Sequence, residues 1–204
     1  LGYFKLKDLI NRGAIGKVFA ANLFGGYYLP YWHPKVDYRK EYSAKKSEGG
    51  GVIFTNHSLD ILCWLFGKIS EVGCFYDKIS NLEIDAEDAA VFILRSQSNI
   101  VISLYCDFLQ RIDQHKLTVV GELGNIECDL IENKINIFNI KTKKWRKINY
   151  KFKVNDMYLK EMRYFIDCLL KNKKPSVNLL EGRNTLELAL AAKKSQKMKK
   201  IINL

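Results

Sequence analysis

The chain has 204 residues, of which 48% are hydrophobic, and it carries a formal net charge of +11 with a pI near 9.3. A chain of this length and composition can bury a substantial core, so we expect one folded domain over residues 1–204. It shows no run of about eighteen apolar residues and no charged-then-apolar leader, which argues against a membrane span and a secretory signal.

The positive charge is concentrated in two stretches, Lys141–Lys153 and Lys193–Lys200. Trp145, Tyr150 and Phe152 lie in or beside the first stretch, as they would on a nucleic-acid-binding surface. Strands whose lysines face solvent give the same pattern, and a basic surface can also attract an anionic substrate. We favour solvent-exposed lysines, and we expect neither nucleic acid nor a membrane as a partner.

The five cysteines are scattered among apolar residues, without a Cys-x-x-Cys pair or the spacing of metal ligands. They are therefore expected to be reduced core residues of a cytoplasmic protein, with no metal site.

The first part of the chain predicts a short helix, a strand and a long loop. The helix spans Phe4–Arg12, the strand spans Lys17–Phe24, and the loop runs over Tyr27–Glu48. Loops of this length in compact domains usually have a function. Aromatic faces and polar donors suit a sugar, and the alternative is that the same rings pack the loop against the rest of the domain. The candidate sugar-binding residues are Trp32, His33, Tyr38, Arg39 and Tyr42.

An apolar helix is expected to follow the glycines at 49–51 and to end at Gly67. One side of this helix is a core-facing stripe of Leu59, Leu62, Cys63 and Phe66. The other side carries His57, Asp60, Ile61 and Trp64, without a Lys or Glu. This side is therefore also buried, or it covers a pocket. An imidazole and a carboxylate at this spacing form either a general acid/base pair or a hydrogen-bonded structural pair.

The rest of the chain predicts strands in consecutive hairpins and then two helices. Strands are expected over Ser70–Ile79, Asp88–Arg95, Asn99–Asp107, Lys116–Glu122, Asn125–Leu130, Lys134–Ile140 and Lys144–Phe152. The helices are expected over Asn155–Leu170 and Leu179–Lys200, the second with Leu186, Ala189 and Leu190 inward.

The predicted fold class is α+β, with a largely antiparallel open β-sheet and helices on one face. The uncovered apolar face predicts association of copies of the chain. His115, at the start of a predicted strand, is expected to be exposed.

Several motifs resemble those of the Gfo/Idh/MocA oxidoreductases. They are the glycines at 49–51, followed by His57-Ser58-Leu59-Asp60 and Trp64-Leu65-Phe66-Gly67. Residues 15–18 and 120–126 agree in order, and residues 28–46 resemble members linked to nucleotide-sugar and surface-polysaccharide pathways. The resemblance covers essentially the whole chain. It implies that the chain is the C-terminal, substrate-binding domain, with a fold of the type seen in glyceraldehyde-3-phosphate dehydrogenase. It also implies that copies of this domain pair sheet to sheet as dimers or tetramers.

The resemblance also implies roles for individual residues. NAD or NADP would exchange hydride with a sugar or nucleotide sugar, His57 would move the hydroxyl proton, and Asp60 would orient His57. Lys17 would contact the cofactor edge or the substrate. The substrate itself would be held by Trp32, His33, Tyr38, Arg39, Tyr42 and Asn56.

The sequence departs from the family pattern in two ways. The Rossmann domain is missing and the chain begins at Leu1, so we expect a C-terminal fragment that is inactive alone. Many members also place an Asp shortly before the histidine, where this chain has Thr55-Asn56. This second departure leaves open a non-catalytic carbohydrate-binding or dimerisation module.

Overall fold

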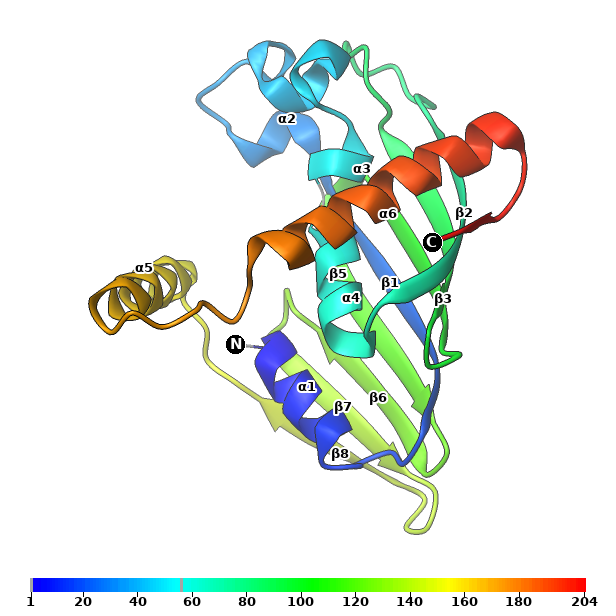
Figure 1. The fold of residues 1–204 in the computed structure, drawn as a ribbon, viewed down its shortest axis with the longest axis vertical. Coiled ribbons are helices and arrows are strands. Elements are labelled where there is room, and N and C mark those ends of the chain that lie inside the picture. The colour runs from blue at the N-terminus through cyan, green and yellow to red at the C-terminus, as the bar shows by residue number, and fades with distance from the viewer. Residues whose placement is uncertain (1, 56) are drawn as a thin grey trace.

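The computed structural model describes residues 2–55 and 57–204. Over these residues the chain forms a nine-stranded sheet in the order β8-β7-β6-β5-β1-β4-β3-β2-β9 (Figure 1). All neighbouring strands are antiparallel except β1 and β4, which run parallel. The strands are β1 (Val18–Tyr28), β2 (Ile69–Asp77), β3 (Ala89–Ser96), β4 (Val101–Asp107), β5 (Leu109–Gly121), β6 (Gly124–Asp129), β7 (Lys134–Asn139), β8 (Lys144–Asn149) and β9 (Ile202–Asn203).

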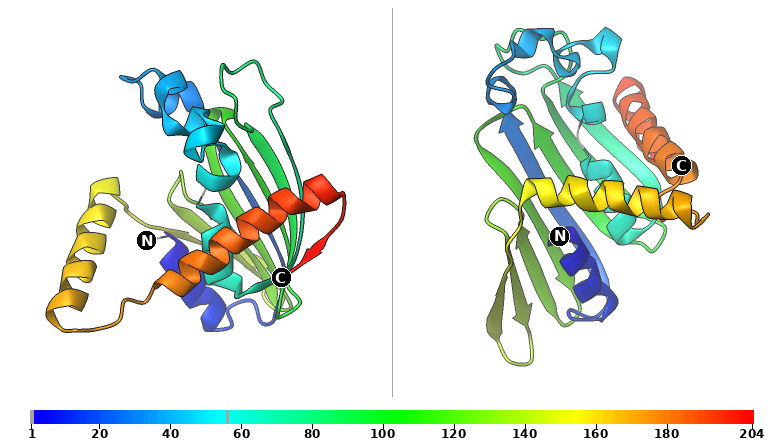
Figure 2. Two further views of the ribbon diagram at one scale, coloured as in Figure 1. Left: turned by 45° about the horizontal axis from the view of Figure 1, so that its top comes forward. Right: turned by 90° about the vertical axis from the view of Figure 1, so that its left-hand side faces the viewer.

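Helices α1, α4 and α6 lie on one face of this sheet (Figures 1 and 2). The predicted fold class, a largely antiparallel sheet with helices on one face, is therefore confirmed. The α-helices are α1 (Gly2–Asn11), α2 (Leu29–Trp32), α3 (Val52–Thr55), α4 (Ser58–Phe66), α5 (Val154–Leu170) and α6 (Leu179–Met198). The expected loop over Tyr27–Glu48 contains the end of β1, α2 and three 3₁₀ turns, at Tyr38–Lys40, Tyr42–Ala44 and Lys46–Glu48.

The alternation of side chains separates the core from the uncovered face of the sheet. In β3, Phe92 and Leu94 are buried under the helices, whereas Val91 and Ile93 are 44% and 55% exposed on the other side. Gly73 of β2 pairs with Ile93, and a Cβ at this glycine would lie 2.7 Å from the Ile93 side chain. The uncovered face is therefore closely packed across its strands although nothing in the described chain lies on it.

Strands β1 and β5 are longer than predicted. Beyond Phe24, β1 continues through Gly25 and Gly26, and β5 begins at Leu109 rather than at Lys116. The extra length comes from backbone pairing between the two strands. Such pairing does not require apolar and polar residues to alternate, so the period of two in the sequence ends before the strands do.

Two of the glycines at 49–51, Gly50 and Gly51, let the segment before α4 pack closely against the rest of the fold. A Cβ at Gly50 would lie 2.2 Å from the carbonyl oxygen of Tyr42, and one at Gly51 would lie 2.5 Å from the carboxylate of Glu87. Gly51 also has φ +96°, a conformation that favours glycine. Glu87 is buried and pairs with Lys193 of α6 at 2.9 Å. The predicted single helix is divided into α3 and α4, and His57 occupies the N-cap position of α4.

Helix α6 packs through its small side chains. Two residues predicted to face inward, Leu186 and Leu190, are each 52% exposed, which corrects that expectation, whereas Ala189 is buried as predicted. The buried residues of α6 are Leu188, Ala189, Ala191, Ala192 and Ser195. The Oγ of Ser195 accepts a hydrogen bond from the Cys74 amide of β2 at 3.2 Å, which small side chains permit because the helix approaches the strand closely.

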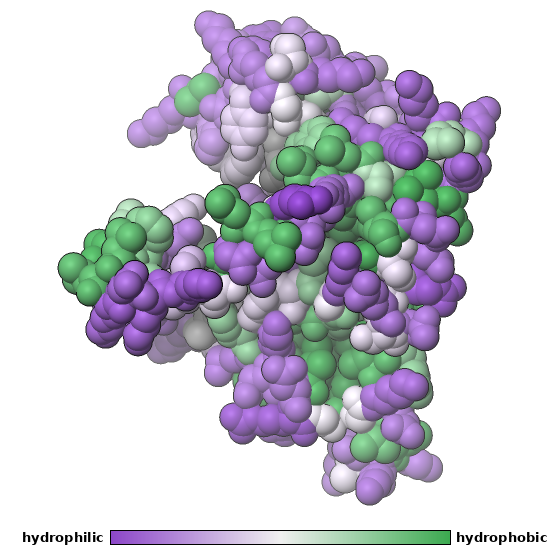
Figure 3. All heavy atoms as spheres, in the orientation of Figure 1, coloured by the Kyte–Doolittle hydropathy of each residue, from purple (hydrophilic) through white to green (hydrophobic). Residues whose placement is uncertain are grey.

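Helix α5 forms as predicted but stands away from the sheet (Figures 1 and 2). Hydrophobic atoms gather on its surface in Figure 3. The exposed fraction of its large apolar residues ranges from 43% at Met157 to 82% at Leu170. Cys168, which is buried, is an exception.

All five cysteines are free thiols. In the part of the chain that is described, no helix combines the length and apolar character needed to cross a membrane.

Candidate functional site

A cavity of about 440 Å³ lies where the end of β1, α2, the start of α4 and the start of β5 meet. It opens beside the sheet rather than within the core. Its lining residues are Gly26, Tyr27, Tyr28, Tyr31, Trp32, His57, Ser58, Ile61, Asp113, Gln114, His115 and Ile131. Of the residues predicted to form the site, the structure brings Trp32 and His57 together here.

Aromatic rings form one wall of this cavity. The Trp32 ring lies 4.7 Å from that of Tyr27, and Tyr28 and Tyr31 meet edge to face at the same centroid distance of 4.7 Å. The guanidinium of Arg111 lies 3.6 Å from the centre of the Tyr28 ring. Because each ring is held by a neighbour, the wall is preformed, and its flat faces suit the C–H surface of a sugar ring.

His57 faces this cavity from the N-terminal end of α4. Its side chain is exposed, and its backbone carbonyl accepts the first hydrogen bond of the helix, from Ile61 at 3.1 Å. Among the described residues, no side chain forms a hydrogen bond with its imidazole. The ring is therefore available to a ligand, with which it can exchange a proton.

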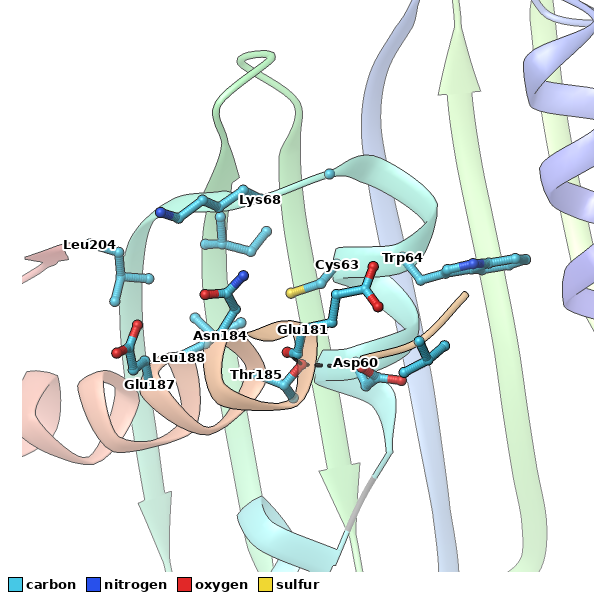
Figure 4. Close-up of a pocket in the computed structure, with 13 residues that line it drawn as sticks. Asp60, Cys63, Trp64, Lys68, Glu181, Asn184, Thr185, Glu187, Leu188 and Leu204 are labelled. Carbon is cyan, nitrogen blue, oxygen red and sulfur yellow. Dashed lines mark hydrogen bonds between the residues drawn. The ribbon is translucent and has the colours of Figure 1, made fainter. Parts of the chain in front are cut away.

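Asp60 lies on the other side of α4, in a second cavity of about 320 Å³ between α4 and α6 (Figure 4). Its Oδ1 accepts a hydrogen bond from the Thr185 hydroxyl at 3.1 Å. The expected contact, in which Asp60 orients His57, is not formed. The spacing of three suggested one face, but His57 precedes the first helical residue, so helical geometry does not set its direction.

Most of the remaining predicted sugar-binding residues hold the loop together instead of lining the cavity. His33 Nδ1 pairs with Glu41 at 2.6 Å, and Arg39 pairs with Asp37 at 2.8 Å and with Glu83 at 3.1 Å. The pKa of Asp37 is lowered mainly by its hydrogen bond with Arg39. The Tyr38 hydroxyl accepts from the Glu83 amide at 3.2 Å, and Tyr42 is 49% exposed outside the lining. The structure here matches the packed-loop interpretation.

Lys17 and Asn56 cannot be placed with the others. Lys17 immediately precedes β1, whose far end, Gly26 to Tyr28, borders the cavity. At about 3.3 Å per residue, the strand puts Lys17 roughly 30 Å away, which corrects the expectation that it joins this site. Asn56 lies outside the described residues.

Strand β5 contributes three lining residues that sequence analysis missed: Asp113, Gln114 and His115. His115 was expected to be exposed, but it is partly buried and its Nε2 is hydrogen-bonded to the hydroxyl of Tyr3 in α1. Burial lowers the pKa of His115, against a smaller opposite effect of Asp129. The missed signal is the period of two, which puts His115 on the same face as the buried Leu117.

Comparison with known proteins agrees with this architecture. Residues 3–127, more than half of the chain, match the GFO/IDH/MocA C-terminal domain. Myo-inositol 2-dehydrogenase of Thermotoga maritima is 27% identical over 209 residues, which cover 98% of this chain and 60% of that protein.

Two solved structures share the fold at low sequence identity. An oxidoreductase from Agrobacterium radiobacter in complex with NAD⁺, L-tartaric acid and magnesium superposes with a TM-score of 0.83 at 16% identity, covering 99% of this chain and 61% of that one. Levoglucosan dehydrogenase in complex with NADH and levoglucosan also superposes with a TM-score of 0.83, at 15% identity, covering 97% of this chain and 62% of that one. The chain thus spans about 60% of the length of these relatives.

Proposed function

Because the chain belongs to the Gfo/Idh/MocA family, we propose that it is the substrate-binding domain of an NAD(P)-dependent oxidoreductase of a sugar or cyclic polyol. The observation that carries this proposal is the exposed imidazole of His57 opposite a wall of aromatic rings in one cavity. A pyranose or cyclohexane ring would stack on the wall and present a hydroxyl to His57. Relatives with the same fold include an inositol dehydrogenase and a levoglucosan dehydrogenase, which supports this substrate class.

The described residues do not offer a dinucleotide site of their own. Gly13 and Gly16 lie in the turn between α1 and β1, so they follow a helix rather than a strand, unlike the glycines of a Rossmann fingerprint. A nicotinamide cofactor, which supplies a hydride acceptor, would have to be held by a separate domain. The part assigned to this chain is to bind the sugar and to take the hydroxyl proton on an imidazole nitrogen of His57.

The charge of the lining favours a neutral substrate. Among the described lining residues Asp113 carries an ionisable carboxylate and none is a Lys or Arg, and the nearby guanidinium of Arg111 is held over the Tyr28 ring. A nucleotide sugar carries a diphosphate that needs cationic partners, and Arg39 is already engaged by Asp37 and Glu83. We therefore propose a sugar or polyol without phosphate in place of the nucleotide sugar that the resemblance of residues 28–46 implies.

We also propose that a second copy of the chain covers the uncovered face of the sheet. Phe75, Val91, Ile93 and Val101 are between 44% and 67% exposed there. They lie on adjacent strands in one area, and apolar areas of this kind are typical of protein interfaces. Sedimentation of the chain before and after Ile93→Glu should show a change from dimer or tetramer to monomer.

The catalytic proposal is tested by following NAD(P)H formation with myo-inositol and levoglucosan in the gene product that contains this chain. Replacing the proton acceptor in His57→Ala should lower kcat by about 10²–10⁴-fold. His33→Ala is the matched control, because His33 lies outside the cavity lining. Its ring pairs with Glu41 and stacks on Trp32 with centroids 4.8 Å apart, so its loss should act on KM through Trp32 while kcat changes by less than about threefold.

Equal turnover of the wild type and both histidine variants would contradict the role of His57. It would favour the alternative of a module that binds carbohydrate or dimerises without taking part in the reaction.

A further inference from the structure

The cavity contains a second histidine whose environment differs from that of His57. His115 lies on β5, opposite Gly25 of β1, on the sheet face that α1 and α4 cover. Its ring meets the Tyr3 ring edge to face, with centroids 5.8 Å apart at 72°. Two separate elements, β5 and α1, therefore fix the position and the plane of this imidazole.

The hydrogen bond between Tyr3 and His115 determines which ring nitrogen faces the rest of the cavity. Nε2 is bonded to the Tyr3 hydroxyl, and Nδ1 lies on the side of Gly25, 3.8 Å from where a Cβ of that residue would be. The next residue, Gly26, lines the cavity together with His115. Because Gly25 has no side chain, this edge of the ring is left uncovered by β1, whereas Gly26 faces Asp107 on the other side of the strand.

The hydrogen-bonding partners of the neutral pair favour one tautomer of His115. Burial lowers the pKa of His115 and raises that of Tyr3, so both are neutral near pH 7. Among the described residues the partly buried Tyr3 hydroxyl has no other acceptor, so its O–H donates to Nε2, and the neutral imidazole then carries its own proton on Nδ1. Nδ1–H has no hydrogen-bond acceptor among the described residues.

Given the function proposed above, we infer that His115, held by Tyr3, is a substrate-positioning residue whose Nδ1–H donates to a hydroxyl oxygen of the bound sugar or polyol. Asp113, two residues earlier on β5, lines the same cavity and can accept from a second hydroxyl. His57 faces the ligand from α4, so the ring is held between a proton-exchanging histidine and a neutral donor. Specificity for the arrangement of hydroxyls would then come from β5.

The first test needs no ligand. Long-range ¹H–¹⁵N spectra of the imidazoles in the 204-residue chain report which nitrogen carries the proton. We expect His115 as the Nδ1–H tautomer, and we expect Tyr3→Phe to reduce that preference. Observation of the Nε2–H tautomer in the wild-type chain would overturn the inference whatever the substrate is.

The second test titrates the same chain with myo-inositol, levoglucosan and L-sorbose. At least one of them should shift the Nδ1 resonance of His115 together with the resonances of His57. His115→Phe should weaken that binding by about fivefold, the effect of one neutral hydrogen bond. His115→Asn, which keeps an N–H near the position of Nδ1, should retain most of it.

The outcomes separate this inference from the proposed function. A polyol that shifts His57 but leaves His115 unchanged would overturn the role of His115 and leave the sugar site in place. If neither histidine responds to any of the three compounds, both proposals fail. If His115→Phe does not fold, the tautomer and the comparison with His115→Asn still decide the question.

Discussion

Helices α4 and α5 each carry a stripe of apolar residues at helical spacing, but they have very different surroundings. In α4, Leu59, Leu62, Leu65 and Phe66 are buried between the sheet and α6. In α5, the apolar residues are largely exposed and the helix stands apart from the sheet. The comparison teaches that a helical period identifies an apolar face without identifying what covers it.

The two helices also differ in how the chain enters them. The segment before α4 is attached by Gly50 and Gly51 and by the buried pair of Glu87 and Lys193. Lys193 lies over the Phe54 ring of α3 at 4.3 Å as well. Neither N-cap residue, His57 of α4 or Lys153 of α5, makes a side-chain cap hydrogen bond, so the contacts of the preceding segment are what distinguish α4. Burial and anchoring thus coincide in α4, and α5 has little of either.

The largest predicted effect compares one leucine from each helix. Leu62→Ala removes a side chain that is 0% exposed, so it leaves a cavity and should lower the free energy of unfolding by about 2–5 kcal/mol. Leu169→Ala makes the same chemical change at a site that is 66% exposed, and it should change that free energy by less than about 0.5 kcal/mol. Urea denaturation of both variants measures the difference.

Similar losses at the two sites would break the comparison. In particular, a loss of more than about 2 kcal/mol for Leu169→Ala would mean that α5 is buried in solution, for example against another copy of the chain.

The next largest effect concerns the buried ion pair of Glu87 and Lys193, which anchors the segment before α4. Lys193→Met keeps much of the side-chain volume but leaves the buried Glu87 carboxylate without its cation. The free energy of unfolding should therefore fall by about 2–3 kcal/mol. The double variant Lys193→Met, Glu87→Gln removes both charges and should recover at least half of that loss. Lys194→Met, at an exposed neighbour, is the control.

The ion pair is confirmed as an anchor only if the double variant is more stable than Lys193→Met alone. If the loss in the double variant equals the sum of the losses in Lys193→Met and in Glu87→Gln alone, Lys193 acts through packing on Phe54 rather than through Glu87.

Much of the fold could be predicted because it depends on local patterns. The β3–β4 hairpin, the helical stripes and the glycines that end the loop are each encoded within a few residues. The extension of β1 and β5, and the choice of Ala191 and Ala192 rather than Leu190 as the buried side of α6, depend on partners distant in sequence. Such contacts leave no periodic trace along the chain.

The site divides in the same way. Sequence reasoning found Trp32, as one of several candidates in an aromatic loop, and His57, as the imidazole on an otherwise apolar helix, and both line the cavity. It grouped Asp60 with His57 by helical spacing, which does not hold at an N-cap. It missed His115: the period of two could have placed this residue on the buried face of β5, but its partner, Tyr3, lies 112 residues away in the sequence.

The smallest predicted effect lies on the solvent side of α4. Asp60 is exposed, and its carboxylate accepts a hydrogen bond from the Thr185 hydroxyl at 3.1 Å, so Asp60→Asn keeps the shape and an acceptor oxygen. We expect a loss of less than about 1 kcal/mol, and a similar loss in Thr185→Val, as for other solvent-accessible hydrogen bonds. Urea denaturation of these variants beside Leu62→Ala compares the two sides of one helix. If Asp60→Asn destabilises the chain as much as Leu62→Ala, then the stability of α4 does not come from its buried stripe, and the contrast between α4 and α5 needs another cause.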